Sequence, residues 1–284
     1  MGFKPLVLGS NGKDYAVASE SRALQNLDME IERDVKPGEI VFIDGSGFKT
    51  LKHSAGKRTA HCAFEWAYTA SVDSVIDGVS VDKARNNMGA MLARKDKGKL
   101  EVDIVAPVPN SGIGHAEGYH LESGIPLKSV FLLDRYGDRS YTQATQGERD
   151  SMAKKKLSVL REAVKGKRIV ICDDSIVRGT QIREKVKELK KAGAKEVHVR
   201  IAVPPLMHPC RYGIATRDYD ELIATKMSVE GICKYIEADS LKYNTLEDLF
   251  EAIGKGKNEM CLYCWDGKAF EEKQKKITEP VNRQ

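Results

Sequence analysis

The clearest fold signal in the sequence is the stretch Arg168-Ile-Val-Ile-Cys-Asp-Asp-Ser-Ile-Val-Arg-Gly-Thr180. The apolar run after Arg168 predicts a buried strand, and a helix is expected from Thr180 to about Lys191. Asp173 and Asp174 lie between them, where we expect the sheet to meet solvent. Their carboxylates can accept hydrogen bonds from vicinal hydroxyls or hold Mg²⁺. The backbone N–H groups of 175–180 lie at the N-terminal end of the expected helix, which carries partial positive charge. This arrangement predicts a phosphate-binding loop.

The alternative reading of this stretch is structural. An Asp-Asp pair often does no more than end a strand and cap a helix. All thirteen residues in this order favour the ligand site instead. The loop is not a Walker A loop, because the chain has no G-x-x-x-x-G-K-[ST] spacing.

Strands and helices alternate on both sides of this stretch. Apolar residues at spacings of three and four predict a helix from Val81 to Leu92. Thr245-Leu-Glu-Asp248 is a capping box that opens another helix, and Gly254 is its expected C-cap. Further strands are predicted at 102–106, 129–133 and 196–203. This order predicts an α/β fold with a mostly parallel sheet and helices on both faces, which binds ligands at the carboxyl ends of its strands.

The first 50 residues have a different pattern. Short β segments are predicted at 6–8, 15–17 and 40–43, separated by turns that contain Gly and Asp. A polar, basic connector at 51–61 separates them from the alternating region. We therefore expect three parts: a small β-rich part at 1–50, an α/β domain at 62–254, and a C-terminal segment at 255–284 with a cysteine pair and a charged tail.

Composition excludes several classes of protein. The 284 residues include 46 basic and 41 acidic ones, so the net charge is only +5 and does not favour a nucleic-acid partner. No apolar run reaches about 18 residues, and the start has no secretory core, so we expect no membrane partner. Six cysteines are too few for a disulfide scaffold. A cytoplasmic location is the prediction, and clustered cysteines are candidates for a metal site.

The stretch at 168–180 resembles the 5-phosphoribosyl-1-pyrophosphate (PRPP) motif of type I phosphoribosyltransferases. The form Asp-Asp-Ser-Ile-Val-Arg-Gly-Thr is most similar to that of the amidophosphoribosyltransferases, which begin purine synthesis. The resemblance covers most of the chain. It continues at 62–68, 73–78, 107–112, 122–126, 192–202, 209–214, 221–224 and 238–241.

This resemblance implies the roles of individual residues. Asp173 and Asp174 would be catalytic, holding the ribose hydroxyls and, together with Ser111, Mg²⁺. Asn110 and Ser111 belong to a loop for the pyrophosphate of PRPP. The remaining PRPP-binding residues would be Ser175, Val177, Arg178, Gly179 and Thr180.

The polar stretch from Asp134 to Gln146, continued through Lys156 and Arg161, resembles the loop that closes over the substrate. It is cationic and poor in core residues, which suits a lid over an anionic substrate. The resemblance makes Arg139 and Lys156 catalytic candidates. The alternative is a solvated surface loop.

Four cysteines form a second constellation. Cys261-Leu-Tyr-Cys264 is a C-x-x-C pair, which is weak evidence by itself. Cys62 and Cys210 stand at the other two positions where many family members place ligands of a [4Fe-4S] cluster. The resemblance therefore implies a structural cluster on these four cysteines, with a Cys₄ zinc site or free thiols as alternatives. Cys172 and Cys233 are expected to be core residues.

The sequence departs from the family pattern at its start. Full-length members begin with a glutaminase domain that carries a nucleophilic cysteine, whereas the first cysteine here is Cys62. Residues 4–41 are similar to the closing strands of that domain, so we interpret them as its structural remnant. Asn110 also stands where the family commonly has Asp, which removes a charge near the metal.

The function implied is formation of 5-phosphoribosylamine from PRPP and ammonia, with release of pyrophosphate. Glutamine use would then require a separate glutaminase chain, and a homo-oligomer is expected. Two alternatives stay open. One is a phosphoribosyltransferase with a different acceptor, and the other is a non-catalytic regulatory protein that binds PRPP or nucleotides.

Overall fold

The central feature of the structure is a four-stranded parallel sheet with the order β14-β13-β12-β9. The computed structural model describes residues 2–53, 59–133, 157–213 and 218–268. The strands of the sheet are β9 (Ile104–Pro107), β12 (Arg168–Asp173), β13 (Glu196–Ile201) and β14 (Ser240–Tyr243). The predicted α/β class is therefore confirmed.

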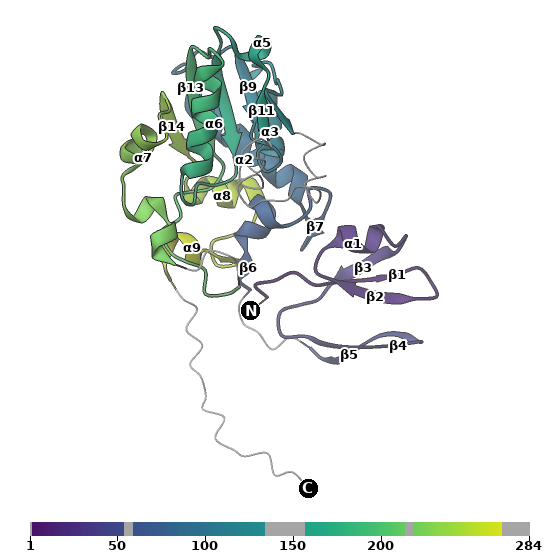
Figure 1. The fold of residues 1–284 in the computed structure, drawn as a ribbon. Helices are drawn as coiled ribbons and strands as arrows, with labels where there is room; N and C mark the ends of the chain where they lie inside the picture. The colour runs from purple at the N-terminus through teal and green to yellow at the C-terminus, as the bar shows by residue number, and fades with distance from the viewer. Residues whose placement is uncertain (1, 54–58, 134–156, 214–217, 269–284) are drawn as a thin grey trace, which may run out of the picture.

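Helices cover both faces of this sheet, because alternate residues of each strand point to opposite sides. Ile169 and Ile171 of β12 pack in one core cluster with residues of α6 (Thr180–Lys191) and α7 (Val229–Tyr235). Val170 and Cys172 pack on the other side with residues of α2 (Val81–Asp96) and α3 (Ile113–Ser123). Figure 1 shows α6 across one face of the sheet.

The predicted helices begin close to where their sequence signals lie. Helix α6 begins at Thr180, and α8 (Leu246–Ile253) has the predicted capping box and a left-handed C-cap at Gly254. Helix α2 continues one turn beyond its predicted end, to Asp96. The strand predicted at 129–133 is shorter than expected, since β10 (Phe131–Leu133) pairs with β11 (Leu157–Val159) over three residues.

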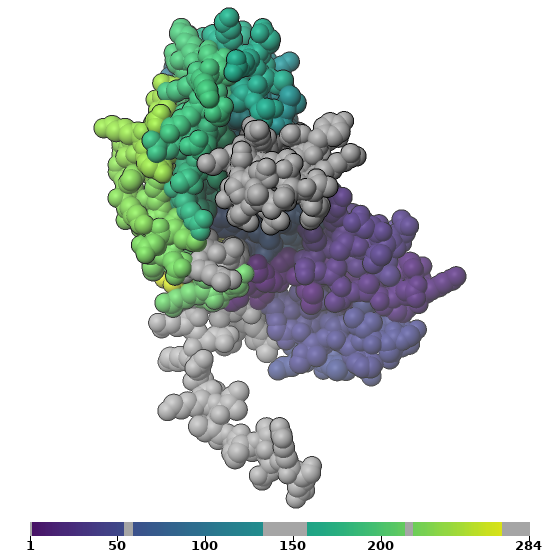
Figure 2. Space-filling model, in the orientation of Figure 1, coloured from purple at the N-terminus to yellow at the C-terminus, as the bar shows by residue number. Residues whose placement is uncertain are grey.

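The N-terminal residues form two small antiparallel units. Strands β1 (Val7–Ser10), β2 (Tyr15–Ala18) and β3 (Glu30–Asp34) form one sheet, and β4 (Ile40–Asp44) pairs with β5 (Gly47–Lys52). The sequence did not predict β3 or the short α1 (Ser21–Gln25). Figure 2 shows these residues as a purple and blue lobe beside the rest of the protein.

Short elements complete the described chain. A parallel pair joins β6 (His61–Cys62) to β15 (Met260–Cys261), so the C-terminal segment pairs with the start of the α/β region. The others are η1 (Glu65–Thr69), β7 (Val75–Ile76), β8 (Val79–Ser80), α5 (Arg161–Val164), η3 (Tyr219–Glu221), η4 (Ile223–Thr225) and α9 (Tyr263–Asp266).

Candidate active site

Two loops meet at the carboxyl end of β12. The loop after β9 lies close against this strand, since the backbone N–H of Val108 donates to the carbonyl of Cys172 at 2.9 Å. Gly112 closes the same loop, and a Cβ there would lie 2.0 Å from the Cys172 oxygen. Only glycine fits, and this close approach holds 107–112 beside the two aspartates.

The loop from β12 to α6 also depends on a glycine. Gly179 caps α6 with a φ of +77°, and a Cβ there would lie 2.8 Å from Cδ1 of Ile223. Ile223 is fixed beside the loop because its N–H donates to the carbonyl of Val177 at 2.9 Å. The loop is therefore held between the sheet and the segment at 219–225.

Hydroxyl groups bind both aspartates. Ser111 Oγ donates to Asp173 Oδ1 at 2.6 Å, and Ser175 Oγ donates to Asp174 Oδ2 at 2.5 Å. The N–H of Asp174 donates to Asp173 Oδ1 at 3.0 Å. The structure thus brings Ser111, Asp173 and Asp174 together, as their shared predicted role requires.

Both aspartates are more buried than the sequence suggested. Asp173 is 8% exposed and Asp174 is 6% exposed, although we expected them to face solvent. Burial, followed by the charge of Asp174, raises the pKa of Asp173 well above its ordinary value. A bound cation or hydroxyl donors would stabilise the charged form of two adjacent carboxyl groups in this environment.

The aspartates lie in the wall of a cavity of about 460 Å³. Ser111, Ser175, Val177, Arg178, Gly179 and Thr180 line the same cavity. Asn110 belongs to the neighbouring loop but is not among the lining residues. Arg139 and Lys156 lie outside the described residues.

The cavity is also lined by residues to which the sequence analysis gave no role. Among them are Phe64, Tyr68, Lys185 and Glu221. Glu221 forms an ion pair with Arg178 of the phosphate-binding loop. Their sequence signals are weak, because a lysine on an amphipathic helix usually faces solvent and an acidic residue in a short 3₁₀ turn usually does the same.

A buried arginine positions one of these residues. Arg85 of α2 is 8% exposed and donates to three carbonyl oxygens around η1, those of Trp66, Tyr68 and Ala70, at 2.9, 2.9 and 2.7 Å. These bonds fix the end of η1 and hold Tyr68 at the cavity wall. These hydrogen bonds join residues 15 to 19 positions apart in the sequence, and no local pattern reveals them.

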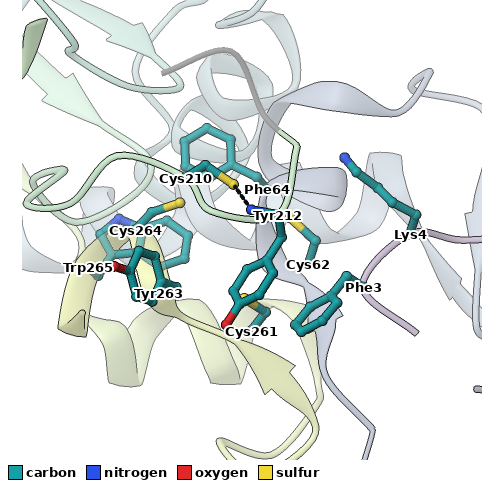
Figure 3. A pocket seen from close by; sticks show the side chains of 10 residues that line it. All are labelled: Phe3, Lys4, Cys62, Phe64, Cys210, Tyr212, Cys261, Tyr263, Cys264 and Trp265. Carbon is teal, nitrogen blue, oxygen red and sulfur yellow. Dashed lines mark hydrogen bonds between the residues drawn. The ribbon is translucent and has the colours of Figure 1, made fainter. Parts of the chain in front are cut away.

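The four predicted cysteine ligands line a second, much smaller cavity of about 10 Å³ (Figure 3). Cys62 and Cys261 are paired residues of β6 and β15, and Cys264 follows on α9. Cys210 completes the set and accepts a hydrogen bond from the N–H of Tyr212 at 3.3 Å. The remaining lining residues are mostly apolar or aromatic: Phe3, Lys4, Phe64, Tyr212, Tyr263 and Trp265.

Burial makes three of the thiols weaker acids. It raises the pKa of Cys62 to about 12 and also raises the pKa values of Cys261 and Cys264. These three thiols are therefore protonated at neutral pH, and ligation of a metal would release protons. Cys172 is buried in β12 and Cys233 lies on α7, both outside this cavity, as predicted.

Two findings concern metals and membranes. Within the described ranges, no three His, Cys, Asp or Glu side chains converge closely enough to hold a single metal ion. None of the helices in the described part of the chain is both long and apolar enough to cross a membrane.

Comparisons with known proteins agree with this architecture. A family model described as phosphoribosyl transferase domain matches residues 82–213. The amidophosphoribosyltransferase of Archaeoglobus fulgidus is 44% identical over 270 residues, and that of Bacillus subtilis is 42% identical over 271. Each match covers 94% of this chain, but only 59% and 56% of the relative. The chain thus spans somewhat more than half the length of these curated relatives.

Solved structures give the same result at the level of the fold. The glutamine PRPP amidotransferase of B. subtilis, solved with ADP and GMP, matches with a TM-score of 0.86 and 42% identity over 95% of this chain and 60% of its own. A structure titled as the allosteric regulatory enzyme of purine biosynthesis matches with a TM-score of 0.87 and 41% identity, over 95% of this chain and 59% of its own. These matches confirm the type I phosphoribosyltransferase fold. The chain has the type I phosphoribosyltransferase fold and is similar, over nearly all of its length, to part of an amidophosphoribosyltransferase.

Proposed function

We propose that this protein forms 5-phosphoribosylamine from PRPP and ammonia and releases pyrophosphate. One observation carries the proposal: two buried, adjacent carboxyl groups and a backbone loop at a helix N-terminus face one cavity of about 460 Å³. Ribose hydroxyls suit the carboxylates, and a phosphate suits the loop. A molecule that carries both, such as PRPP, fits this combination.

The proposed roles follow the geometry. Asp173 and Asp174 bind the ribose hydroxyls, and the loop at 175–180 binds the 5′-phosphate. Ser111 faces the pyrophosphate, and Asn110, which precedes it in the same loop but does not line the cavity, stays a candidate from the resemblance alone. Mg²⁺, bound through Asp173, Asp174 and Ser111, would neutralise charge on the leaving pyrophosphate. Oxygen donors of this kind are the ligands that Mg²⁺ prefers.

The reaction does not require a side chain to act as a nucleophile or general base. The bond from ribose C1 to the pyrophosphate oxygen breaks and its electron pair leaves with pyrophosphate. The lone pair of ammonia forms the new bond to C1, and a proton passes from nitrogen to solvent. Positioning the donor, stabilising the leaving charge and excluding water are the main contributions. Arg139 and Lys156 stay candidates for closing the site over the donor.

The proposal also covers the source of ammonia and the partners of the protein. Ammonia is the nucleophile, and glutamine becomes a substrate only where a glutaminase on a separate polypeptide supplies it. Large apolar side chains are exposed on the N-terminal strands, among them Val17, Ile40 and Phe42, which suits contact with such a partner. A homo-oligomer, the cytoplasmic location and the division at 1–50, 62–254 and 255–284 stay predictions.

Pyrophosphate release is the experiment that tests the reaction. Purified protein is incubated with PRPP and Mg²⁺, with ammonium, with glutamine, or with neither. Release that depends on ammonium, with 5-phosphoribosylamine as the product, is the expected result. PRPP binding without release under any condition would contradict the enzyme and leave the regulatory binding protein in its place.

We also propose that Cys62, Cys210, Cys261 and Cys264 hold a structural [4Fe-4S] cluster. The assignment is supported by the position of these four cysteines, which come from three segments of the chain and line one mostly apolar cavity. The cluster would tie the β15–α9 segment to β6 and so stabilise the C-terminal part of the fold.

Metal content of anaerobically purified protein tests this assignment. Wild-type protein should contain about four irons and show visible absorption. Cys264→Ser should lose both, whereas Cys233→Ser, the matched control outside the cavity, should keep them. Stoichiometric zinc with a flat visible spectrum would contradict the cluster.

A further inference from the structure

Helix α6 carries five basic residues, and four of them have carboxylate partners. The ion pairs join Arg183 to Glu237, Lys187 to Glu184 and Glu237, Lys190 to Asp239, and Lys191 to Glu188. Lys185 is the exception: among the described residues its ammonium group has neither an ion pair nor a hydrogen bond. This lysine therefore has a different environment from the rest of the helix.

That environment is the wall of the donor cavity. Lys185 is half-buried and lines the cavity together with Thr180, Gln181 and Ile182, the residues that begin α6. Positions 181, 182 and 185 lie on neighbouring parts of one helix face, because residues three and four apart are adjacent on a helix. The side chain of Lys185 thus extends the cavity wall one turn beyond the phosphate-binding loop.

The charges around the cavity leave this lysine uncompensated. Asp173, Asp174 and Glu221 are its acidic lining residues, and Arg178 and Lys185 are the basic ones. Arg178 pairs with Glu221. Lys185 is thus the one cation in the described lining that no carboxylate contacts, in a cavity proposed to receive a strongly anionic donor.

Position along the helix indicates which part of the donor it faces. The first N–H groups of α6 serve one phosphate, and five residues further along the helix is an axial distance of about 7.5 Å. Ser111 of the 107–112 loop lines the same cavity as Lys185 and donates a hydrogen bond to Asp173. Lys185 and the loop proposed for pyrophosphate therefore line one cavity.

We propose that Lys185 is a further donor-binding residue, whose ammonium group contacts the pyrophosphate of PRPP. This inference rests on the proposed function, because it takes PRPP as the ligand. A single charge-assisted contact of this kind is worth about tenfold in affinity. The contact exists before the C1–oxygen bond breaks, so its loss raises the KM for PRPP more than it lowers kcat.

Three variants and two partial ligands test the proposal. Inorganic pyrophosphate with Mg²⁺ and ribose 5-phosphate are titrated separately into wild type, Lys185→Met, Lys185→Arg and the matched control Lys187→Met, and binding is measured by calorimetry. Lys185→Met should weaken pyrophosphate binding about tenfold and change ribose 5-phosphate binding by less than about twofold. Lys185→Arg should restore most of the affinity, and Lys187→Met should match wild type.

Selective loss of pyrophosphate affinity supports the proposal. It is overturned if Lys185→Met keeps wild-type affinity for pyrophosphate, or if it weakens both ligands equally. Circular dichroism of each variant checks that the fold is intact. Absence of ammonium-dependent pyrophosphate release by wild type would contradict the proposed reaction separately, because the affinity difference is measured without turnover.

Discussion

Two buried carboxylate clusters border the same parallel sheet, and they differ in how their charge is balanced. One surrounds Asp96, the last residue of α2, and the other contains Asp173 and Asp174 at the end of β12. All three carboxyl groups are less than a tenth exposed. Burial alone therefore does not distinguish them.

The cluster around Asp96 is complete. Arg200 donates to its carboxylate from Nε and Nη2 at 2.5 and 3.0 Å, Lys242 Nζ donates at 2.7 Å, and the Tyr119 hydroxyl donates at 2.8 Å. Burial by itself would raise the pKa of Asp96, but the hydrogen bond and charge of Arg200, with Lys242 and Tyr119, bring the pKa below its ordinary value. This carboxylate has the partners that burial demands.

The cluster at β12 is incomplete. Only hydroxyl and backbone N–H groups donate to Asp173 and Asp174 among the described residues, and the pKa of Asp173 is raised. One fold thus uses buried carboxyl groups in two ways. Where cations of the chain complete the cluster, the role is stability, and where the chain leaves charge unbalanced, the site suits a ligand.

Substitution of Asp96 gives the largest expected effect. Asp96→Asn leaves Arg200, which is 1% exposed, without its carboxylate, so the free energy of unfolding should fall by about 3–5 kcal/mol. Urea unfolding measures the change, and PRPP affinity should stay at the wild-type value. The matched control is Glu188→Gln, which breaks an exposed pair with Lys191 and should leave stability within error. A fall below about 1 kcal/mol for Asp96→Asn would refute the structural role.

Substitution of Asp174 should have the opposite effects: activity should fall and stability should not. Asp174→Asn keeps an acceptor for Ser175 but removes a charge from the donor site, so pyrophosphate release should fall about 10²- to 10³-fold. Stability should not fall, because the repulsion from Asp173 is relieved. Asp220→Asn, at an exposed carboxylate outside the cavity lining, is the control. Full activity with lost stability would make this cluster structural, like that of Asp96.

Acid should destabilise the protein partly through protonation of Asp96. This effect should be smaller than those of the two substitutions. A carboxyl group whose folded pKa is depressed contributes its full stabilisation above its ordinary pKa, and this contribution is lost as the pH falls through the lowered value. The difference in unfolding free energy between wild type and Asp96→Asn should therefore be constant near neutral pH and narrow below about pH 4. Unfolding curves at several pH values measure it, and a difference that widens in acid would contradict the assignment.

The local parts of this account were predictable from the sequence. The strand, loop and helix at 168–191 form in place because their signals are contiguous, and the capping box at Thr245 acts within four residues. The cysteine positions came from the resemblance, and the pairing of β6 with β15 is the tertiary contact that brings them together.

The rest depends on contacts between distant segments. The Asp96–Arg200 pair joins residues 104 positions apart, and no periodic pattern marks it. Burial of Asp173 and Asp174 results from the loops packed around them, which a strand end alone does not reveal. In the sequence, Lys185 looks like any lysine on the solvent-exposed face of a helix. Only the structure distinguishes it from Lys187, because Lys185 lines the cavity and Lys187 pairs with Glu237.

Titration of PRPP into wild-type protein, with and without Mg²⁺, shows whether the aspartates at the end of β12 form a donor site. The incomplete carboxylate cluster predicts tight binding of PRPP that depends on Mg²⁺, is retained in Asp96→Asn and is lost in Asp174→Asn. Absence of PRPP binding to wild type in the presence of Mg²⁺, or equal binding by wild type and Asp174→Asn, would contradict the assignment of this edge of the sheet as the donor site.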